Sequence, residues 1–363
     1  MNPFAPSRYA SLLTKALVPV AACAVVATLM PSTPSVTASP QITPASSSSV
    51  NLRFGSFNVQ SVGLDKTSGN QRPWKVRRSV VIRQILGEGV DVLGVQEVNP
   101  SSAFAPRLVD GKNQFRDLRN GLNKAGGHYA LANANGWNCV NPTTHYKCRY
   151  KAQGASGSER ILYDTRKVTK LYASGMQYSR QGAGHKGMFL AWAWFRSKAN
   201  GHKFLFTTTH LDPPHRAIRQ AQWRQMIAKI KKIKRGYPVV SVGDFNTQKF
   251  DTMAKPMLPA MKNAGFGDVL NQRYATNPAT GVRAKHLVDA WINSNNHLDR
   301  NMRSWSYEDR HDKIGNNIDY IFASNSLRVP EFKEVVDHNG LNVNGVFPSD
   351  HNMIRATLKL PTP

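Results

Sequence analysis

Short polar clusters stand at or near the ends of apolar runs over most of this chain, and they constrain its fold more than any other feature. Burying a polar group costs free energy unless the group is paired, so a soluble fold has little reason to end its strands in this way. A site assembled from strand ends provides such a reason. The clusters are Ser56-Phe57-Asn58, Gln96-Glu97, Thr209-His210, Gly243-Asp244-Phe245-Asn246, Asn317-Ile318-Asp319-Tyr320 and Ser349-Asp350-His351.

The residue types in these clusters suit metal-assisted cleavage of a phosphate ester. Amide and carboxylate oxygens are hard ligands of the kind that Mg²⁺ prefers. Histidines transfer protons near neutral pH, and carboxylates can orient them. No cluster of cysteines and histidines with zinc-site spacing occurs in the sequence. The combination therefore predicts metal-assisted acid–base chemistry on a phosphoryl group.

The N-terminus has the pattern of an export signal. Arg8 and Lys15 precede an apolar run from Ala16 to Met30, and Val36-Thr37-Ala38 offers small residues for cleavage. The run is short for a membrane span, although a single-pass anchor stays an alternative. A lipoprotein is a second alternative, because the residues up to Cys23 resemble a lipobox, but the apolar run continues beyond this cysteine.

We therefore predict a secreted protein with three parts. Residues 1–38 form a signal peptide, and residues 39–50 form a disordered linker that is rich in Ser, Thr and Pro. Residues 51–363 form one catalytic domain, because no internal repeat or second linker interrupts them. Cys139 and Cys148 are the cysteines outside the signal. In an exported protein they predict one loop disulfide, and two free thiols are the alternative.

The charge of the chain indicates a polyanionic partner. The formal net charge is +26, and removal of Arg8 and Lys15 with the signal leaves +24. This charge exceeds what solubility requires and attracts nucleic acid, anionic lipid surfaces or acidic polymers. The charge alone does not choose among them.

Hydrophobic periodicity predicts helices and strands that alternate early in the chain, whereas neighbouring strands follow one another elsewhere. This mixture favours an α/β sandwich with mixed sheets over a purely parallel doubly wound sheet. The expected strands cover 52–59, 90–95, 160–163, 188–195, 203–209, 237–242, 318–323 and 354–360, and the expected helices cover 74–86, 115–122 and 216–234.

Taken together and in this order, the polar clusters resemble those of the endonuclease/exonuclease/phosphatase superfamily. Its members include deoxyribonuclease I-like nucleases, abasic-site endonucleases, neutral sphingomyelinases and inositol polyphosphate phosphatases. The resemblance extends from Phe54 to Leu360. It implies an α/β four-layer sandwich in which two mixed β-sheets are flanked by helices.

The resemblance also implies roles for individual residues. Glu97 would be the main ligand of Mg²⁺, or of Mn²⁺ in its place, with Asn58 and Asp350 beside it. This small set suits Mg²⁺, which keeps several waters and binds substrate phosphate oxygens. Asp244 and Asn246 would orient the attacking water and the scissile phosphate.

Two histidines would carry the acid–base chemistry. His351, held by Asp319, would act as general base or as a cation that stabilises the phosphate. His210 would bind a phosphate oxygen or protonate the leaving group. Both roles suit an imidazole, whose reference pKa is about 6.5. Which histidine is the acid and which is the base stays open.

A finer similarity to deoxyribonuclease I-like enzymes involves Ser158-Glu159-Arg160. In those enzymes a Glu in this segment partners the first catalytic His, which implies that Glu159 orients His210. The alternative is a surface acid at the start of a strand. Gly157 departs from the pattern, because those enzymes carry a Tyr there. Lys186 is the nearest candidate for their phosphate-binding Arg, and it is a weaker, monodentate substitute.

The function that follows is a secreted, Mg²⁺-dependent phosphodiesterase that cleaves DNA or RNA with little sequence preference. The expected helix and its end, 216–235, carry eight basic residues and no acid, so we expect nucleic acid to contact Lys231, Lys232 and Lys234. A solvated basic face is the alternative for these lysines. A sphingomyelinase-like lipid phosphodiesterase or a phosphoinositide phosphatase is the alternative function, with anionic lipid as partner. No stable protein partner is implied, and we expect a monomer.

Overall fold

The computed structural model describes residues 48–65, 72–133, 157–184, 187–247, 318–324, 326–335 and 346–363, and the backbone of 142–144, 147–148, 287–289 and 297–298. These residues belong to one compact unit, Pro44–Pro363. Two large mixed β-sheets form its centre. The predicted fold class is therefore confirmed.

The first sheet has seven strands, and its central pair, β1 and β2, is parallel. β1 also pairs with β15, and β2 with β6, both antiparallel. In spatial order the strands are β12 (His297–Leu298), β14 (Arg328–Val335), β15 (Met353–Leu360), β1 (Val50–Asn58), β2 (Val92–Gln96), β6 (Arg160–Asp164) and β3 (Tyr129–Leu131).

The second sheet has six strands and also contains a parallel pair, β9 and β10. In spatial order its strands are β11 (Leu287–Asp289), β13 (Asp319–Ser324), β10 (Val239–Asp244), β9 (Lys203–His210), β8 (Phe189–Ser197) and β7 (Val168–Gln177). Two short strands, β4 (Pro142–Thr144) and β5 (Lys147–Cys148), form a separate hairpin.

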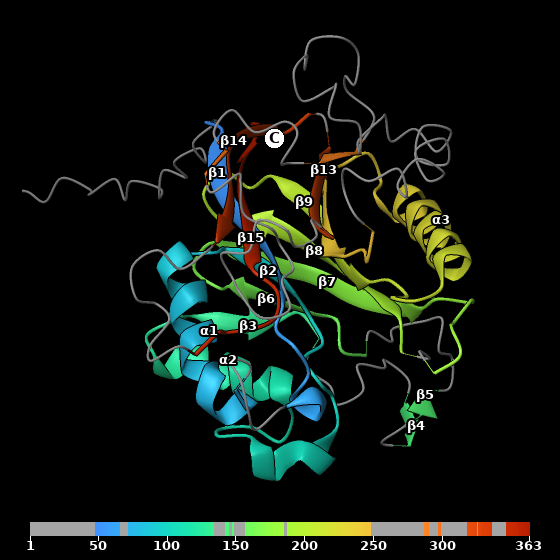
Figure 1. Cartoon of the computed structure of the whole chain (residues 1–363). Coiled ribbons are helices and arrows are strands. Elements are labelled where there is room, and N and C mark those ends of the chain that lie inside the picture. The colour runs from blue at the N-terminus through green and yellow to red at the C-terminus, as the bar shows by residue number, and fades with distance from the viewer. Residues whose placement is uncertain are drawn as a thin grey trace, which may run out of the picture. The chain divides into compact units, whose positions relative to one another are not determined.

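Helices cover the outer faces of both sheets, as Figure 1 shows. α1 (Trp74–Glu88) and α2 (Gln114–Lys124) pack on the first sheet, where Ile82, Ile85 and Leu118 share a buried cluster with strand residues. α3 (Arg216–Ile233) packs on the second sheet through Trp223, Met226 and other apolar residues. Two short 3₁₀ helices, η1 (Val62–Leu64) and η2 (Ser102–Arg107), complete the set. Within the described residues, no helix is long and apolar enough to cross a membrane.

The space between the two sheets is apolar at one end and polar at the other. Alternate residues of a strand share one face, so every second side chain of β1 and β9 points into this space. Phe54 and Phe206 lie there in the buried apolar cluster. Further along the same strands, the inward positions are Ser56 and Asn58 in β1, and Thr208 and His210 in β9. The strands therefore deliver polar side chains to one edge of the sandwich.

Gly94, in the middle of β2, allows the two sheets to approach each other beside that edge. A Cβ atom at this position would lie 2.6 Å from Thr208 Oγ1 and would also collide with Val242, both in the second sheet. Next to it, Gln96 Nε2 donates a hydrogen bond to Thr208 Oγ1 at 2.8 Å. A glycine and one hydrogen bond thus hold the sheets close where the polar residues begin.

All of the expected helices and strands are present within a few residues of their predicted bounds. Two long strands, β7 and β14, were not predicted. Only one neighbour pairs with β7, and Thr169 to Tyr172 are exposed, so the strand lacks a clear apolar alternation. β14 contains Pro330 and a register shift between Arg328 and Glu331. Proline and irregular pairing both weaken the sequence signal of a strand.

Candidate active site

The polar clusters of the sequence meet at one edge of the two sheets. The parallel pair β1–β2 places Asn58 beside Gln96, and the parallel pair β9–β10 places His210 beside Asp244. β13 runs antiparallel to β10 and begins at Asp319, directly opposite Asp244. Both sheets therefore contribute strand ends to the same site.

Asp244 lies at the centre of this site and is 2% exposed. Its Oδ2 atom is 3.5 Å from His210 Nε2 and 3.6 Å from His351 Nε2, so two imidazoles face one carboxylate oxygen. The same oxygen accepts a hydrogen bond from Asn58 Nδ2 at 3.1 Å, and Oδ1 accepts one from the backbone nitrogen of Asn246 at 2.9 Å. Asp244 is thus held in place by groups from both sheets.

His351 forms a buried pair with Asp319, as the sequence predicts. Its Nδ1 atom is 2.8 Å from Asp319 Oδ2, and the two side chains are 4% and 1% exposed. Burial alone would lower the pKa of His351, but the charges of Asp319, Asp244 and Asp350 outweigh it and raise the pKa to about 10. The imidazole is therefore a cation at neutral pH, with Nε2 directed toward Asp244.

The three predicted metal ligands belong to one hydrogen-bond network. Asn58 Nδ2 donates to Glu97 Oε1 at 2.9 Å, and the backbone nitrogen of Ser61 donates to Glu97 Oε2 at 3.0 Å. Ser349 Oγ contacts Asp350 Oδ1 at 3.1 Å and donates to the carbonyl of Asn58 at 2.7 Å. The loops that follow β1 and β2 and the loop that precedes β15 thus meet around Asn58.

The donor chemistry of these residues fits a divalent cation. Burial raises the pKa of Asp350, and the negative charge of Glu97 acts in the same direction. Carboxylates that repel each other in a buried place are suited to a hard cation. A second group of possible ligands is buried next to them: ligand atoms of Asp244, Asp319 and His351 lie within 4.8 Å of one another.

The backbone at the strand ends adopts conformations that few residues take. Glu97 has a φ of 62° and Asn246 a φ of 48°, both in the left-handed region. Such conformations cost free energy in residues other than glycine and are concentrated at functional sites. Asn246 is fixed further by a hydrogen bond from its Nδ2 to the carbonyl of Leu211 at 2.9 Å. The turns after β2 and β10 therefore hold these side chains in defined directions.

Glu159 does not pair with His210 in this structure. The Glu159 side chain is 1% exposed, so the alternative of a surface acid is wrong. Its Oε2 atom has no hydrogen-bond partner, and His210 contacts Asp244 instead. Burial raises the pKa of Glu159 well above its usual range. A buried carboxyl group with a raised pKa, without a contact to His210, therefore stands where the family resemblance implies an orienting carboxylate.

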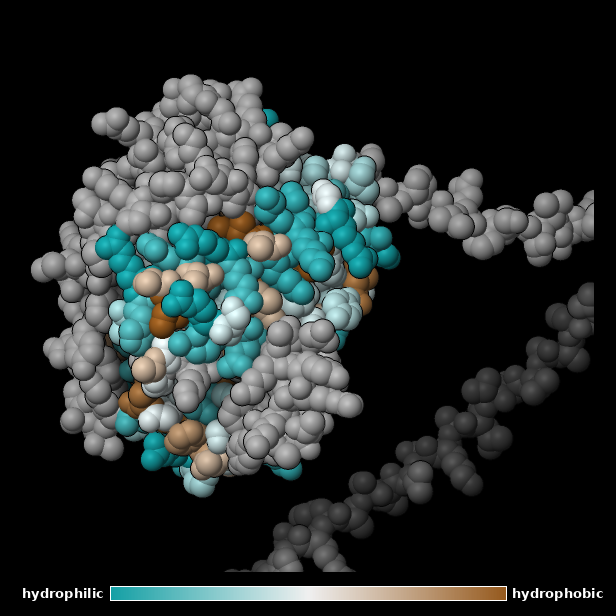
Figure 2. Space-filling model, turned by 90° about the vertical axis from the view of Figure 1, so that its right-hand side faces the viewer, coloured by the Kyte–Doolittle hydropathy of each residue, from teal (hydrophilic) through white to brown (hydrophobic). Residues whose placement is uncertain are grey.

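The predicted substrate-binding lysines are not gathered at the site. Lys231, Lys232 and Lys234 lie at the C-terminal end of α3, next to the start of β10, whereas the site lies at the end of that strand. α3 has 18 residues, a length of about 27 Å, which separates these lysines from the strand ends. Figure 2 views the molecule from this side, and most of the described surface there is hydrophilic.

Three other predicted residues lie outside the side chains that the structure describes. Lys186 and Cys139 lie outside the described residues, and Cys148 is described only by its backbone in β5. The phosphate-binding role of Lys186 and the disulfide therefore stay predictions.

Arg77 is a buried residue that the sequence did not identify as part of the site. Its guanidinium group is completely buried and donates hydrogen bonds to the carbonyls of Val59, Gln60 and Pro348. The first two carbonyls follow Asn58, and the third precedes Asp350, so Arg77 joins two loops that carry predicted metal ligands. An arginine in a helix usually predicts an exposed position. Only the spacing of three residues from Trp74, on the apolar face of α1, indicated that Arg77 is buried.

We predict that Arg77→Lys weakens binding of a divalent cation. Lysine keeps the charge but cannot reproduce the fan of hydrogen bonds that a guanidinium group makes. Mn²⁺ affinity, measured by isothermal titration calorimetry, should fall about 10-fold to 100-fold, as is typical when a group that positions metal ligands is removed. Gln84→Met on the same helix is the matched control, because it removes a buried hydrogen bond to Val335 and none to the loops that carry the ligands. Wild-type Mn²⁺ affinity in folded Arg77→Lys would contradict this role.

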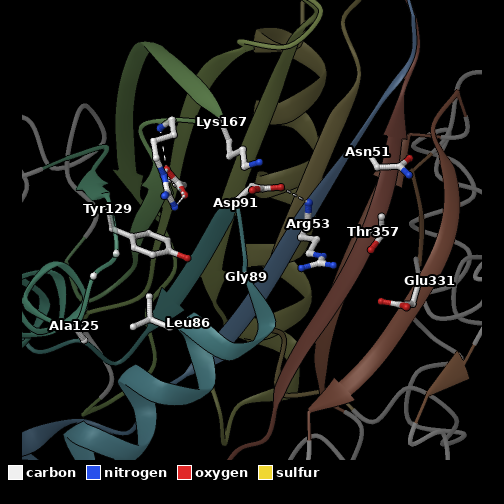
Figure 3. Close-up of a pocket in the computed structure, with 14 residues that line it drawn as sticks. Asn51, Arg53, Leu86, Gly89, Asp91, Ala125, Tyr129, Lys167, Glu331 and Thr357 are labelled. Atoms are coloured by element: carbon white, nitrogen blue, oxygen red, sulfur yellow. Dashed lines mark hydrogen bonds and ion pairs between the residues drawn. The ribbon is translucent and has the colours of Figure 1, made fainter.

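A cavity of about 680 Å³ lies away from the strand ends. It is located where β1 begins and α1 ends, and Figure 3 shows Arg53, Asp91 and Lys167 directed into it. Three basic and three acidic side chains line it, so their charges balance, and Asp164 already pairs with Arg166 at 2.7 Å. This cavity is therefore not part of the site described above.

The family model described as "Endonuclease/Exonuclease/phosphatase family" matches residues 55–351. The chain belongs to this family. The match begins in β1 and ends at His351, so it includes every strand end that forms the site. Among curated proteins, the comparison finds no match.

Solved structures share the fold of this chain. A family member from Bacteroides thetaiotaomicron has a TM-score of 0.60 at 18% identity and covers 87% of this chain and 100% of its own. A mannosyl-6-phosphatase from the same organism has a TM-score of 0.57 at 19% identity, with 85% and 99% covered. D. rerio TDP2, complexed with a single-strand DNA product, has a TM-score of 0.53 at 16% identity, with 85% and 98% covered. At these identities the likeness concerns the fold alone.

Proposed function

We propose that this protein is a secreted, Mg²⁺- or Mn²⁺-dependent phosphodiesterase that cleaves nucleic acid with little sequence preference. The observation that carries the hydrolytic part is the arrangement of two imidazoles around Asp244, with the Glu97 and Asp350 carboxylates nearby. Family membership supports hydrolysis of a phosphate ester. The predicted export segment, residues 1–38, supports secretion.

Each residue of the site has a separate role in the reaction. Asp244 Oδ2 accepts a hydrogen bond from the attacking water and orients it toward phosphorus. The cationic His351 donates from Nε2 to a phosphoryl oxygen, and Asp319 keeps the imidazole in this orientation. His210, on the other side of Asp244, binds a second phosphoryl oxygen or protonates the leaving oxygen. Asn246 holds Asp244 through its backbone nitrogen.

The cation would be held by Glu97, Asn58 and Asp350. It would supply charge stabilisation to the phosphoryl oxygens when bound. Arg77 keeps the loops that carry these ligands together before any cation binds.

Nucleic acid is the substrate class that the charge favours. A net charge of +24 after removal of the signal suits a polymer with a phosphate at every nucleotide. The likeness to a TDP2 structure that contains single-strand DNA supports the same class. The mannosyl-6-phosphatase defines the competing possibility, a small phosphomonoester.

One panel of substrates tests this proposal. The purified protein without residues 1–38 is incubated with supercoiled plasmid, single-stranded RNA, sphingomyelin, a phosphoinositide and mannose 6-phosphate, each with Mg²⁺ and with EDTA. We expect Mg²⁺-dependent cleavage of plasmid or RNA. Hydrolysis of a lipid or of the sugar phosphate without cleavage of either nucleic acid would replace the nuclease assignment by that activity.

A further inference from the structure

The part of the chain that forms β7, β8, β9 and α3 is nearly devoid of acidic residues. From Val168 to Gly243 the sequence contains fourteen Lys and Arg residues and one acid, Asp212. Asp212 is completely buried, and its Oδ1 atom is 3.0 Å from Nδ1 of His215. The described surface of these elements is therefore cationic.

Three aromatic side chains lie together on the outer face of the second sheet, the face that α3 partly covers (Figure 1). Trp194 in β8 packs against the buried cluster beneath α3, and Tyr172 in β7 is its register partner, so the two side chains share this face. The ring of Tyr237, which follows α3, meets that of Trp194 edge-on at 5.5 Å. Tyr172 is 57% exposed and Tyr237 38%. Exposed rings that gather in one place indicate an interaction surface, whereas scattered single ones do not.

Two basic side chains accompany these rings. Arg196 lies two residues after Trp194 in β8 and therefore on the same face, and Lys203 in β9 is the register partner of Arg196. The Nζ atom of Lys203 is 5.8 Å from the ring centre of Tyr237. Among the described residues, neither Arg196 nor Lys203 forms an ion pair. We call this group the aromatic–basic surface: Tyr172, Trp194, Arg196, Lys203 and Tyr237.

The aromatic–basic surface lies at the opposite end of the second sheet from the candidate active site. It includes Lys203, the first residue of β9, whereas the site includes His210, the last residue of the same strand. The ends of this eight-residue strand are about 23 Å apart. At about 3.4 Å per nucleotide, a strand of about seven nucleotides covers this distance. A ligand that reaches both places is therefore a polymer.

A single-stranded polynucleotide matches the chemistry of this surface. Its unpaired bases offer flat faces that stack on tyrosine and tryptophan rings, and its phosphates are attracted to Arg and Lys. In a duplex the bases stack on one another, so the rings of the surface cannot reach their faces. An acidic polysaccharide would use the cations but has no base to stack on the exposed rings.

We propose that the aromatic–basic surface binds single-stranded nucleic acid at a distance from the candidate active site. This inference rests on the proposed nuclease function and adds a second contact with the substrate. The contact holds a long strand on the protein while another part of the strand lies at the strand ends. It is independent of sequence, because every base has a face that can stack.

The first test measures binding without cleavage. A fluorescein-labelled single-stranded 20-mer is titrated in EDTA, and fluorescence anisotropy gives its Kd at several salt concentrations. Tyr172→Leu/Tyr237→Leu removes two rings and keeps every charge, so the Kd should rise at least about tenfold while the salt slope stays the same. Tyr172→Phe/Tyr237→Phe is the matched control, because it keeps both rings and should bind like the wild type.

The second test concerns the cations. Arg196→Gln/Lys203→Gln should lower the salt slope by about 1.4, the value for two phosphate contacts on a single strand. Lys75→Gln/Lys112→Gln removes the same charge from exposed positions beside the first sheet and should change the slope much less.

Three results would overturn the assignment of this surface. They are wild-type binding by the leucine variant, an equal loss in the leucine and phenylalanine variants, and a wild type that does not bind the 20-mer. An equal loss of affinity for a 20-base-pair duplex in the leucine variant would also overturn it, because a duplex offers no unpaired base. None of these results depends on turnover, so Mg²⁺-dependent cleavage of plasmid or RNA by the wild type would still uphold the nuclease proposal.

Discussion

His351→Gln is expected to lower kcat by about two to three orders of magnitude, the range observed when a preorganised donor to a transition-state oxygen is removed. The imidazole is cationic, its Nδ1 is fixed by Asp319 at 2.8 Å, and its Nε2 is 3.6 Å from the central oxygen of Asp244. Glutamine can fill part of the space but cannot carry the charge or transfer a proton. Steady-state kinetics on the substrate found in the panel would measure the effect, which should appear in kcat more than in KM.

Two controls separate chemistry from folding in this variant. His128→Gln changes an exposed histidine far from the strand ends and should retain wild-type kcat. Folded His351 has a pKa of about 10, above the unfolded value of about 6.5, so in the metal-free protein it contributes stability below pH 6.5 that is lost as the pH rises through 10. The free energy of unfolding of His351→Gln, measured with urea, should therefore be lower than that of the wild type at pH 6. Above pH 10 the difference should be much smaller. A folded variant with near wild-type kcat would remove His351 from the mechanism.

Removal of divalent cations is expected to abolish activity, and Mg²⁺ or Mn²⁺ should restore it. The oxygen ligands Asn58, Glu97 and Asp350 share one partly buried network, and two of them are carboxylates. Glu97→Gln removes one of these charges and should raise the metal concentration needed for half-maximal activity by at least about 10-fold. Activity is measured after dialysis against EDTA and titration with each ion.

Glu88→Gln is the matched control for this prediction. Glu88 is also a carboxylate held by ion pairs, with Lys333 at 2.7 Å and Arg355 at 2.9 Å, but it lies at the end of α1 away from the ligands. Its substitution should leave the metal requirement unchanged. Full activity of the wild type in excess EDTA would show that the chemistry does not use a divalent cation.

The sequence predicted the parts of the site that depend on strand ends. Six site residues each stand at or beside the end of an apolar run, and the structure brings them together. They are Asn58, Glu97, His210, Asp244, Asp319 and His351. The pairing of His351 with Asp319 was also predicted. These residues were identifiable because a polar group at the end of a buried strand has few purely structural explanations.

The parts that sequence did not predict depend on packing between distant segments. The role of Arg77 is one of these parts, because nothing local in the sequence shows that Pro348 meets the helix that carries it. The choice of α3 as the cationic surface followed charge count alone. The structure shows that the direction of α3 carries its last turn away from the site.

Gly94 has a consequence that extends beyond packing. Asn58, Glu97 and His351 lie at strand ends of one sheet, whereas His210, Asp244 and Asp319 lie at strand ends of the other, and this glycine allows the two sheets to approach closely beside them. The distance between the two sheets therefore sets the spacing of the reacting groups. A single added methyl group at residue 94 would shift the two halves of the machinery apart, although it touches no ligand.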